Sequence, residues 1–319
     1  MLALSKYRPK TYLDYLLYNT NSIAVRWNLI YAKHKGIEMT EKYLSGRSAI
    51  VTGGASGMGR AIAIALARHG ANVTIGSYTR KNENDISHPE NIDTYLPTSR
   101  ELDETVDELK SAGVQALALH HDAGSFESCQ SLVNTAVETF GGVDILCNAA
   151  GVWISRPICE HNEEDWSYVI DTNLSGYFRM IRLVLPAMMK SGWGRIINVA
   201  STAANIGAEG NAAYCAAKAG ILGLTRCVAL EGASSGVTAN AINPGWVDTG
   251  LFRASLDTIV KQDQDNKTTQ ETFSEIEQSI PQKRFIAPEE IAALAAFLCH
   301  DHAQSLTMED ITVAGGAHW

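Results

Sequence analysis

The chain has 319 residues, a net charge of −9 at pH 7, and 45% hydrophobic against 19% charged residues. A compact chain of this length buries about three-quarters of the surface that its unfolded form exposes, which is enough for one large core. The acidic balance argues against nucleic acid and anionic membrane surfaces as partners, although a local site can still bind an anionic cofactor.

The cysteines are scattered and form no Cys-x-x-Cys or Cys/His pattern, so we expect no metal site. Packing is expected for all six of them, and a reduced, cytoplasmic compartment is the default. No uninterrupted apolar stretch is long enough to span a membrane, so no such span is expected. The first residues lack the apolar core and cleavage site of a signal peptide, and we expect none.

Residues 1–46 differ from the rest of the chain because they are rich in tyrosine and have a local excess of basic residues. Apolar residues at helical spacing, such as Leu13, Leu16 and Leu17, predict two short amphipathic helices. Three interpretations compete: an arm that packs on its own domain or a neighbouring subunit, an interfacial membrane helix, and a targeting segment. The modest apolar stripes favour the packing arm, an extension of a domain at 47–319.

From Arg47 onward, short apolar runs alternate with amphipathic segments. Apolar runs without apolar/polar alternation indicate a parallel sheet covered on both faces, hence a doubly wound α/β fold with seven strands. Residues 79–98 are polar and read as a surface insertion, and residues 250–283 as a partly helical substrate loop. The expected strands lie near 48–52, 72–77, 114–122, 143–148, 195–199, 237–244 and 310–313, and the expected helices near 53–70, 98–113, 125–142, 163–190, 211–235 and 288–299.

The first strand runs directly into a glycine-rich turn and a helix. Missing side chains let the backbone approach a pyrophosphate, and the helix N-terminus offers free N–H groups and a positive dipole. A turn in this place therefore predicts a dinucleotide site. Its candidate residues are Thr52, Gly53, Ser56, Gly57, Met58 and Gly59.

The tip of the second strand is expected to meet the adenosine ribose, where a carboxylate would repel a 2′-phosphate. The chain has Ser77 and Tyr78 there, followed by Arg80 and Lys81. Two cations and no acid favour NADP(H), with NAD(H) as the alternative. In the competing interpretation, Arg80 and Lys81 are solvated charges of the insertion. Ser56, where a basic residue would also favour NADP(H), adds no support.

Tyr214 and Lys218 are four residues apart on a predicted helix and therefore share one face. A nearby ammonium favours the phenolate and is expected to lower the pKa of the tyrosine toward neutrality, as acid/base catalysis requires. Ser201, at the end of the preceding strand, is placed to hydrogen-bond a carbonyl or hydroxyl oxygen. Taken alone, a Tyr-x-x-x-Lys pair is weak evidence; its neighbours in the sequence strengthen it.

With these motifs placed, residues 47–319 resemble the short-chain dehydrogenase/reductase family in its single-domain Rossmann form. TGGASGMG matches the family's TGxxxGxG turn, NAAG at 148–151 matches NNAG with alanine for the second asparagine, and Ser201, Tyr214 and Lys218 match its serine and YxxxK. The N-terminal arm, the 79–98 insertion and the ending TMEDITVAGG, which lacks the usual glycine and aspartate, depart from the pattern.

The resemblance implies hydride transfer, with Tyr214 as proton donor or acceptor, Ser201 polarising the carbonyl, and Asn173 continuing a proton relay. It also implies that Lys218 tunes Tyr214 and binds the nicotinamide ribose. Further cofactor contacts implied by the matching positions are Asp122, Asn148, Ala149, Gly151, Tyr214, Pro244, Gly245, Val247 and Thr249.

The substrate is expected to be a hydrophobic or cyclic secondary alcohol or ketone, because Trp153, Trp246 and Phe252 are placed to line an apolar pocket. Aromatic residues at strand ends are as often part of the core, and a 3-oxoacyl thioester is the rival substrate. A catalytically silent regulatory or scaffold subunit is the alternative of another class. A homodimer or homotetramer is expected from the resemblance, through the helices at 163–190 and 211–235.

Overall fold

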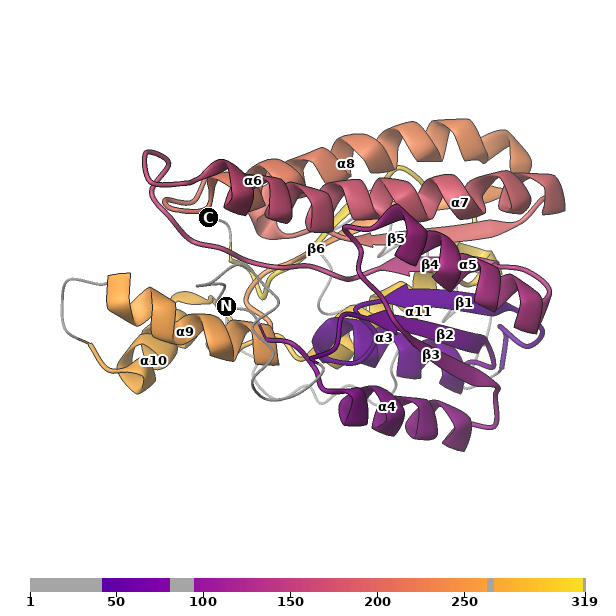
Figure 1. Ribbon diagram of the computed structural model, residues 1–319, viewed down its shortest axis with the longest axis horizontal. Helices are drawn as coiled ribbons and strands as arrows, with labels where there is room; N and C mark the ends of the chain where they lie inside the picture. The colour runs from indigo at the N-terminus through magenta and orange to yellow at the C-terminus, as the bar shows by residue number, and fades with distance from the viewer. Residues whose placement is uncertain (1–41, 81–94, 263–266, 318–319) are drawn as a thin grey trace, which may run out of the picture.

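The computed structural model describes residues 42–80, 95–262 and 267–317. Most of the predicted N-terminal arm, Lys81 and most of the 79–98 insertion therefore lie outside the described residues. Within them, seven strands form one parallel sheet in the order β3-β2-β1-β4-β5-β6-β7 (Figure 1), which confirms the predicted fold class. The strands are β1 Ser48–Thr52, β2 Asn72–Ser77, β3 Ala116–His120, β4 Ile145–Asn148, β5 Gly194–Val199, β6 Val237–Pro244 and β7 Asp310–Val313.

Helices cover both faces of the sheet (Figure 1). Helices α3, α4 and α11 lie on one face, and α5, α6, α7 and α8 on the other, while α9 and α10 lie beyond the sheet at the left of the view. The bounds are α3 Gly57–Arg68, α4 Ser99–Ser111, α5 Phe126–Phe140, α6 Glu163–Ile170, α7 Gly176–Ser191, α8 Ala212–Gly232, α9 Gly250–Gln262, α10 Thr269–Ser279 and α11 Pro288–Leu298.

Each face of the sheet has its own apolar core. Strands β1, β5 and β6, which lie between the two cores, are buried along their whole length. One core joins α3 and α11 to β1 and β2, and the other joins α5 and α7 to β4 and β5. Burial of this surface supplies the main driving force for folding, at about 25 cal/mol per Å² of apolar area.

The order of the sheet reverses between β1 and β4, which are neighbours although β2 and β3 come between them in the chain. Open α/β sheets bind ligands at such a switch point, beyond the carboxyl ends of the strands. The glycine-rich turn after β1 and the NAAG segment after β4 both lie there.

The predicted helix at 163–190 is interrupted by a π-helical turn, Asp171–Ser175. The Asn173 side chain in this turn accepts a hydrogen bond from the Val152 N–H (2.8 Å) and donates to the Val152 carbonyl (2.8 Å). The extra residue turns Asn173 toward the loop after β4. Such π-bulges are frequent at functional sites.

The last residues of the predicted arm pack on the domain. Leu44 is buried in the core of α3 and α11, and the Tyr43 hydroxyl donates to the Ala296 carbonyl (2.8 Å). The rings of His69 and His300 flank Tyr43 at 4.5 and 4.4 Å between centroids. Tyr43 and Leu44 therefore pack against helices α3 and α11.

Among the described helices, the segment Ala212–Ser235 is long and apolar enough to cross a membrane, with a mean hydropathy of 1.3 over 18 residues. Helices inside a protein core pass the same test, so this is weak evidence for a span. The segment packs along β6 and buries the Lys218 side chain.

Two valines one turn apart on α5 test the energetics of the second core. Val133 is 6% exposed and Val137 is 42% exposed. We expect Val133→Ala to lower the free energy of unfolding by about 2 kcal/mol, since it removes two buried methyl groups. Val137→Ala, with the same change in helix propensity, is the control and is expected to stay within about 0.5 kcal/mol of wild type. Urea unfolding measures both; equal losses would contradict the assignment of this face to the core.

Candidate active site

The turn after β1 requires glycine at two positions. Gly53 has a φ of +69°, and a Cβ there would lie 2.9 Å from the backbone nitrogen of Ala150. A Cβ on Gly59 would lie 2.2 Å from the Gly53 carbonyl oxygen. Only glycine fits such close approaches of backbone to backbone. The Thr52 hydroxyl also accepts hydrogen bonds from the N–H groups of Ala149 and Ala150 (3.1 and 3.2 Å), which joins the turn to the NAAG segment.

A cleft with an empty volume of about 850 Å³ lies over this turn and opens to solvent. Its walls come from the ends of β1 to β4 and the start of α9. The glycine turn, the helix N-terminus and the cleft over them fit a dinucleotide. Predicted cofactor residues that line it are Gly53, Ser56, Gly57, Met58, Gly59, Ser77, Tyr78, Asp122, Ala149, Gly151 and Thr249.

Other predicted cofactor residues have structural partners instead. Asn148 is fully buried, and its amide donates to the Asn198 side chain (2.9 Å), so it supports the sheet and does not line the cleft. The Gly245 N–H donates to the Val313 carbonyl (3.0 Å), and Val247 is buried. Pro244 ends β6.

The structure ties Arg80 to the end of the insertion. Its Nε donates to the Leu96 carbonyl (3.0 Å), and its backbone N–H donates to the Pro97 carbonyl (3.0 Å). Arg80 therefore holds the end of the insertion and is not part of the cleft wall. Three described residues of the insertion, Tyr95, Leu96 and Pro97, do line the cleft, so its end is not only surface.

Ser201, Tyr214 and Lys218 come together beyond the end of β5. Ser201 follows β5 and hydrogen-bonds the Tyr214 side chain. Lys218 lies one turn after Tyr214 on α8, with its Nζ 5.5 Å from the Tyr214 ring centroid. The Lys218 ammonium donates to the Val199 carbonyl (2.9 Å), which also accepts from the Tyr177 hydroxyl (3.0 Å).

The expected lowering of the Tyr214 pKa is not found. Burial raises the pKa of Tyr214, and the hydrogen bond with Ser201 opposes this only in part. Burial also lowers the pKa of Lys218 to about 7. The ammonium is therefore partly lost at neutral pH, and its N–H group points at the Val199 carbonyl. Desolvation is the largest cause of the pKa shift in both groups.

Gly151 connects this group to the cleft. It lines the cleft, and a Cβ there would lie 3.3 Å from Asn173 Oδ1 and 3.8 Å from Lys218 Nζ. The Asn173 side chain is committed to Val152, so its amide fixes the wall next to Lys218. Lys218 therefore lies directly behind the part of the cleft wall that Gly151 forms.

The three predicted substrate residues take different positions. The Trp153 indole donates to Asn211 Oδ1 (2.5 Å), which joins the loop after β4 to the start of α8. Phe252 is only 7% exposed and packs on Trp246 (5.2 Å between ring centroids) and Phe285 (5.0 Å). Trp246 and Phe252 therefore belong to an aromatic cluster that anchors α9.

Sequence reasoning missed several cleft residues. Tyr168 and Thr172, one turn apart on α6 and the π-turn, line the cleft, as do Tyr95 and His121. Burial lowers the pKa of His121 to about 4, so its ring is neutral at pH 7. The four-residue spacing of Tyr168 and Thr172 was the available signal. Among the described residues, no cluster of three or more His, Cys, Asp or Glu side chains is placed to hold a metal ion.

Comparisons with known proteins agree with this geometry. Residues 92–318 match the family model described as "Enoyl-(Acyl carrier protein) reductase". The chain is similar to 3-oxoacyl-[acyl-carrier-protein] reductase FabG of Staphylococcus epidermidis (34% identity, 85% of this chain and 99% of that protein). It is also similar to D-beta-hydroxybutyrate dehydrogenase of Rhizobium meliloti (37% identity, 85% and 98%).

Two solved structures have the same fold. Actinorhodin polyketide ketoreductase with NADPH is 34% identical, with a TM-score of 0.76, and the match covers 87% of this chain and 99% of that one. Levodione reductase is 28% identical, with a TM-score of 0.74 and coverage of 85% and 97%.

The buried lysine is expected to cost stability. Because the folded pKa of Lys218 is about 7 and its ordinary value is 10.5, the unfolded chain binds more protons between these pH values. Stability should therefore rise with pH across this window, by a few kcal/mol in total at ~1.4 kcal/mol per pKa unit. Lys218→Met removes this penalty and leaves the Val199 carbonyl bonded to Tyr177.

We expect Lys218→Met to be more stable than wild type at pH 7, with a gain that shrinks toward pH 10. Thermal unfolding at a series of pH values measures it, with Lys190→Met on α7 as the control lysine. A Lys218→Met variant that is less stable than wild type at pH 7 would refute the assigned burial cost.

Proposed function

Because the chain belongs to the short-chain dehydrogenase/reductase family of oxidoreductases, we propose that it transfers a hydride between NAD(P)(H) and a hydrophobic or cyclic secondary alcohol or ketone. One observation carries this proposal: the hydroxyls of Ser201 and Tyr214 and the ammonium of Lys218 lie together beyond β5, one residue's width from the wall of a dinucleotide cleft. This is the arrangement that carbonyl reduction needs, with a proton donor and a second hydroxyl at one oxygen.

The side chains divide the work between them. When bound, the nicotinamide supplies or accepts the hydride. Ser201 hydrogen-bonds the substrate oxygen and stabilises the charge that develops on it. Tyr214 gives its proton to that oxygen during reduction and takes it back during oxidation. Burial keeps Tyr214 protonated at neutral pH, so the ligand-free site is set for proton donation.

Lys218 and Asn173 position Ser201 and Tyr214. Lys218 ties α8 to the end of β5 through the Val199 carbonyl and thereby holds Tyr214 beside Ser201. We propose that Lys218 also hydrogen-bonds the nicotinamide ribose, since its Nζ lies next to Gly151 of the cleft. The π-turn around Asn173 carries the relay of the proton toward solvent.

A 3-oxoacyl thioester is the second candidate substrate, and the similarity to a 3-oxoacyl-[acyl-carrier-protein] reductase favours it. The similarity to levodione reductase favours a ketone instead. Trp153 is the aromatic side chain we assign to substrate contact, because Trp246 and Phe252 are taken up by the aromatic cluster.

NADP(H) was expected on two grounds, the missing carboxylate at the tip of β2 and the cations that follow it. The tip of β2 carries Ser77 and no carboxylate, and one similar structure is described with NADPH. Arg80 does not line the cleft, but its charge lies near Glu101. We also propose a cytoplasmic homodimer or homotetramer through α6, α7 and α8, where Phe178 and Leu230 are 49% and 70% exposed.

A cofactor titration combined with a substrate panel tests the proposal. Protein fluorescence with NADH and NADPH reports binding, and absorbance at 340 nm reports turnover with cyclic ketones, linear ketones and a 3-oxoacyl thioester. Turnover restricted to the thioester would replace the first candidate by the second. Cofactor binding without turnover on any member would favour a regulatory subunit.

Removing one hydroxyl tests the mechanism. Tyr214→Phe is expected to bind the cofactor as wild type does and to lose at least ~100-fold in kcat, the usual contribution of a positioned acid. Tyr177→Phe is the matched control, because it also removes one buried tyrosine hydroxyl. That hydroxyl donates to the Val199 carbonyl, to which Lys218 still donates in the variant. If Tyr214→Phe keeps more than a few per cent of the wild-type rate, Tyr214 is not the proton donor.

A further inference from the structure

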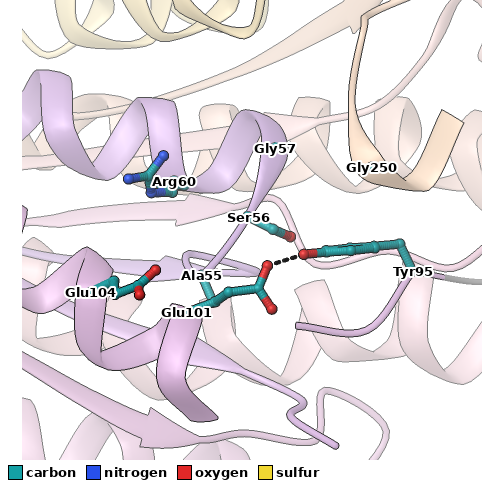
Figure 2. A pocket seen from close by; sticks show the side chains of 8 residues that line it. All are labelled: Ala55, Ser56, Gly57, Arg60, Tyr95, Glu101, Glu104 and Gly250. Carbon is teal, nitrogen blue, oxygen red and sulfur yellow. Dashed lines mark hydrogen bonds between the residues drawn. The ribbon is translucent and has the colours of Figure 1, made fainter. Parts of the chain in front are cut away.

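A second hollow adjoins the cleft on the outer side of the glycine turn (Figure 2). Its lining comes from the turn, from α3 and α4, and from the end of the insertion. It shares Ser56, Gly57, Tyr95 and Gly250 with the cleft, so the two spaces meet. The residues that line it are Ala55, Ser56, Gly57, Arg60, Tyr95, Glu101, Glu104 and Gly250.

The hollow borders the position of an adenosine ribose. In dinucleotide-binding sheets the tip of the second strand meets the ribose hydroxyls. Here that tip is Ser77, whose hydroxyl accepts a hydrogen bond from the Ala55 N–H (2.9 Å). A ribose held at Ser77 would lie next to Ala55, which lines the hollow.

Glu101 is held at this border by its own helix. The Thr105 hydroxyl, one turn further along α4, contacts the Ala55 carbonyl (3.4 Å), so the first turns of α4 pack against the glycine turn. Glu101 also closes the capping box of α4: its Oε2 accepts from the Thr98 N–H (2.8 Å) and from the Thr98 hydroxyl (2.9 Å). The carboxylate is thus fixed before any ligand arrives.

Tyr95 holds the same carboxylate from the other side. Its hydroxyl donates to Glu101 Oε1, as the dashed line in Figure 2 shows. A Cβ on Gly250 would lie 3.0 Å from the Tyr95 ring, so the ring packs directly on the start of α9. Burial raises the pKa of Tyr95 to about 12, which keeps it a hydrogen-bond donor. Burial would raise the pKa of Glu101, but the bonds from Thr98 and Tyr95 outweigh it and lower that pKa.

The other charged side chains that line the hollow form ion pairs with residues outside it. The Arg60 guanidinium donates to Glu108 (2.6 Å) and Thr105 (3.2 Å) on α4. Glu104 is 54% exposed and pairs with Arg100. Arg80 stabilises the charge of Glu101 through space, while its Nε donates to the Leu96 carbonyl. Glu101 is therefore a fixed carboxylate of the hollow, with the Arg80 charge nearby.

We propose that Glu101 determines cofactor choice: it repels a 2′-phosphate and accepts hydrogen bonds from the ribose hydroxyls, so that the chain prefers NAD(H) to NADP(H). The first turn of α4 thus supplies the acid that such folds otherwise carry about 20 residues after the glycine turn. The inference rests on the proposed function, since it concerns the cofactor of that site, and it reverses the choice expected from Ser77 and Arg80.

Binding of cofactors and fragments tests this without turnover. Calorimetry on the full chain compares NADH with NADPH, and ADP with adenosine 2′,5′-bisphosphate, in wild type and Glu101→Gln. Glutamine preserves the capping box, so the fold should be retained. We expect wild type to bind NADH at least ~10-fold more tightly, and Glu101→Gln to reduce that ratio about tenfold, mainly by tightening NADPH.

Glu104→Gln is the matched control, because it removes a carboxylate from the same hollow and the same helix, and it should leave the ratio unchanged. Tyr95→Phe keeps the ring on Gly250 and frees the Glu101 carboxylate, so we expect a partial loss of discrimination. A wild-type preference for NADPH, or an unchanged ratio in a folded Glu101→Gln variant, would overturn the inference and leave the proposed function standing. No binding of either cofactor to wild type would overturn both.

Discussion

The hydrogen bond from the Lys218 ammonium to the Val199 carbonyl is the contact on which the site depends. It joins α8 to the last residue of β5, two residues before Ser201. Burying an ammonium is costly, and the lowered pKa of Lys218 measures that cost. The two apolar cores on the faces of the sheet offset this cost.

A second constraint aligns the cleft with this contact. The Thr52 hydroxyl holds the two N–H groups that follow β4, and Asn173 holds both backbone groups of Val152. The short segment from Ala149 to Val152 is therefore fixed at both ends. Gly151 lies in the middle of it, with no side chain to separate Lys218 from the cleft. Positioning here comes from polar contacts to backbone, which loops can make without disturbing the packed layers.

The fold was readable from the sequence because its signals are local. Short apolar runs gave the strands, and Thr98 and Pro288 marked helix starts at the positions observed. What the sequence did not show depends on partners far along the chain. The π-turn needs Val152, 21 residues before Asn173, and Asn148 is turned into the sheet by Asn198. The raised pKa of Tyr214 reflects burial, which no local spacing of Tyr and Lys reports.

At the end of the insertion, one local motif both caps a helix and lines the hollow beside the cleft. Thr98 and Glu101 are a capping box, and the spacing alone predicts that they begin a helix. The capping hydrogen bonds also fix the direction of a carboxylate, and the contact of Thr105 with Ala55 brings that carboxylate to the glycine turn. A charge used for helix capping is thereby available to a ligand at no further conformational cost. Because the carboxylate is ordered by the helix itself, its effect on a bound ribose does not depend on the tip of β2, and Ser77 remains free to hold the Ala55 N–H.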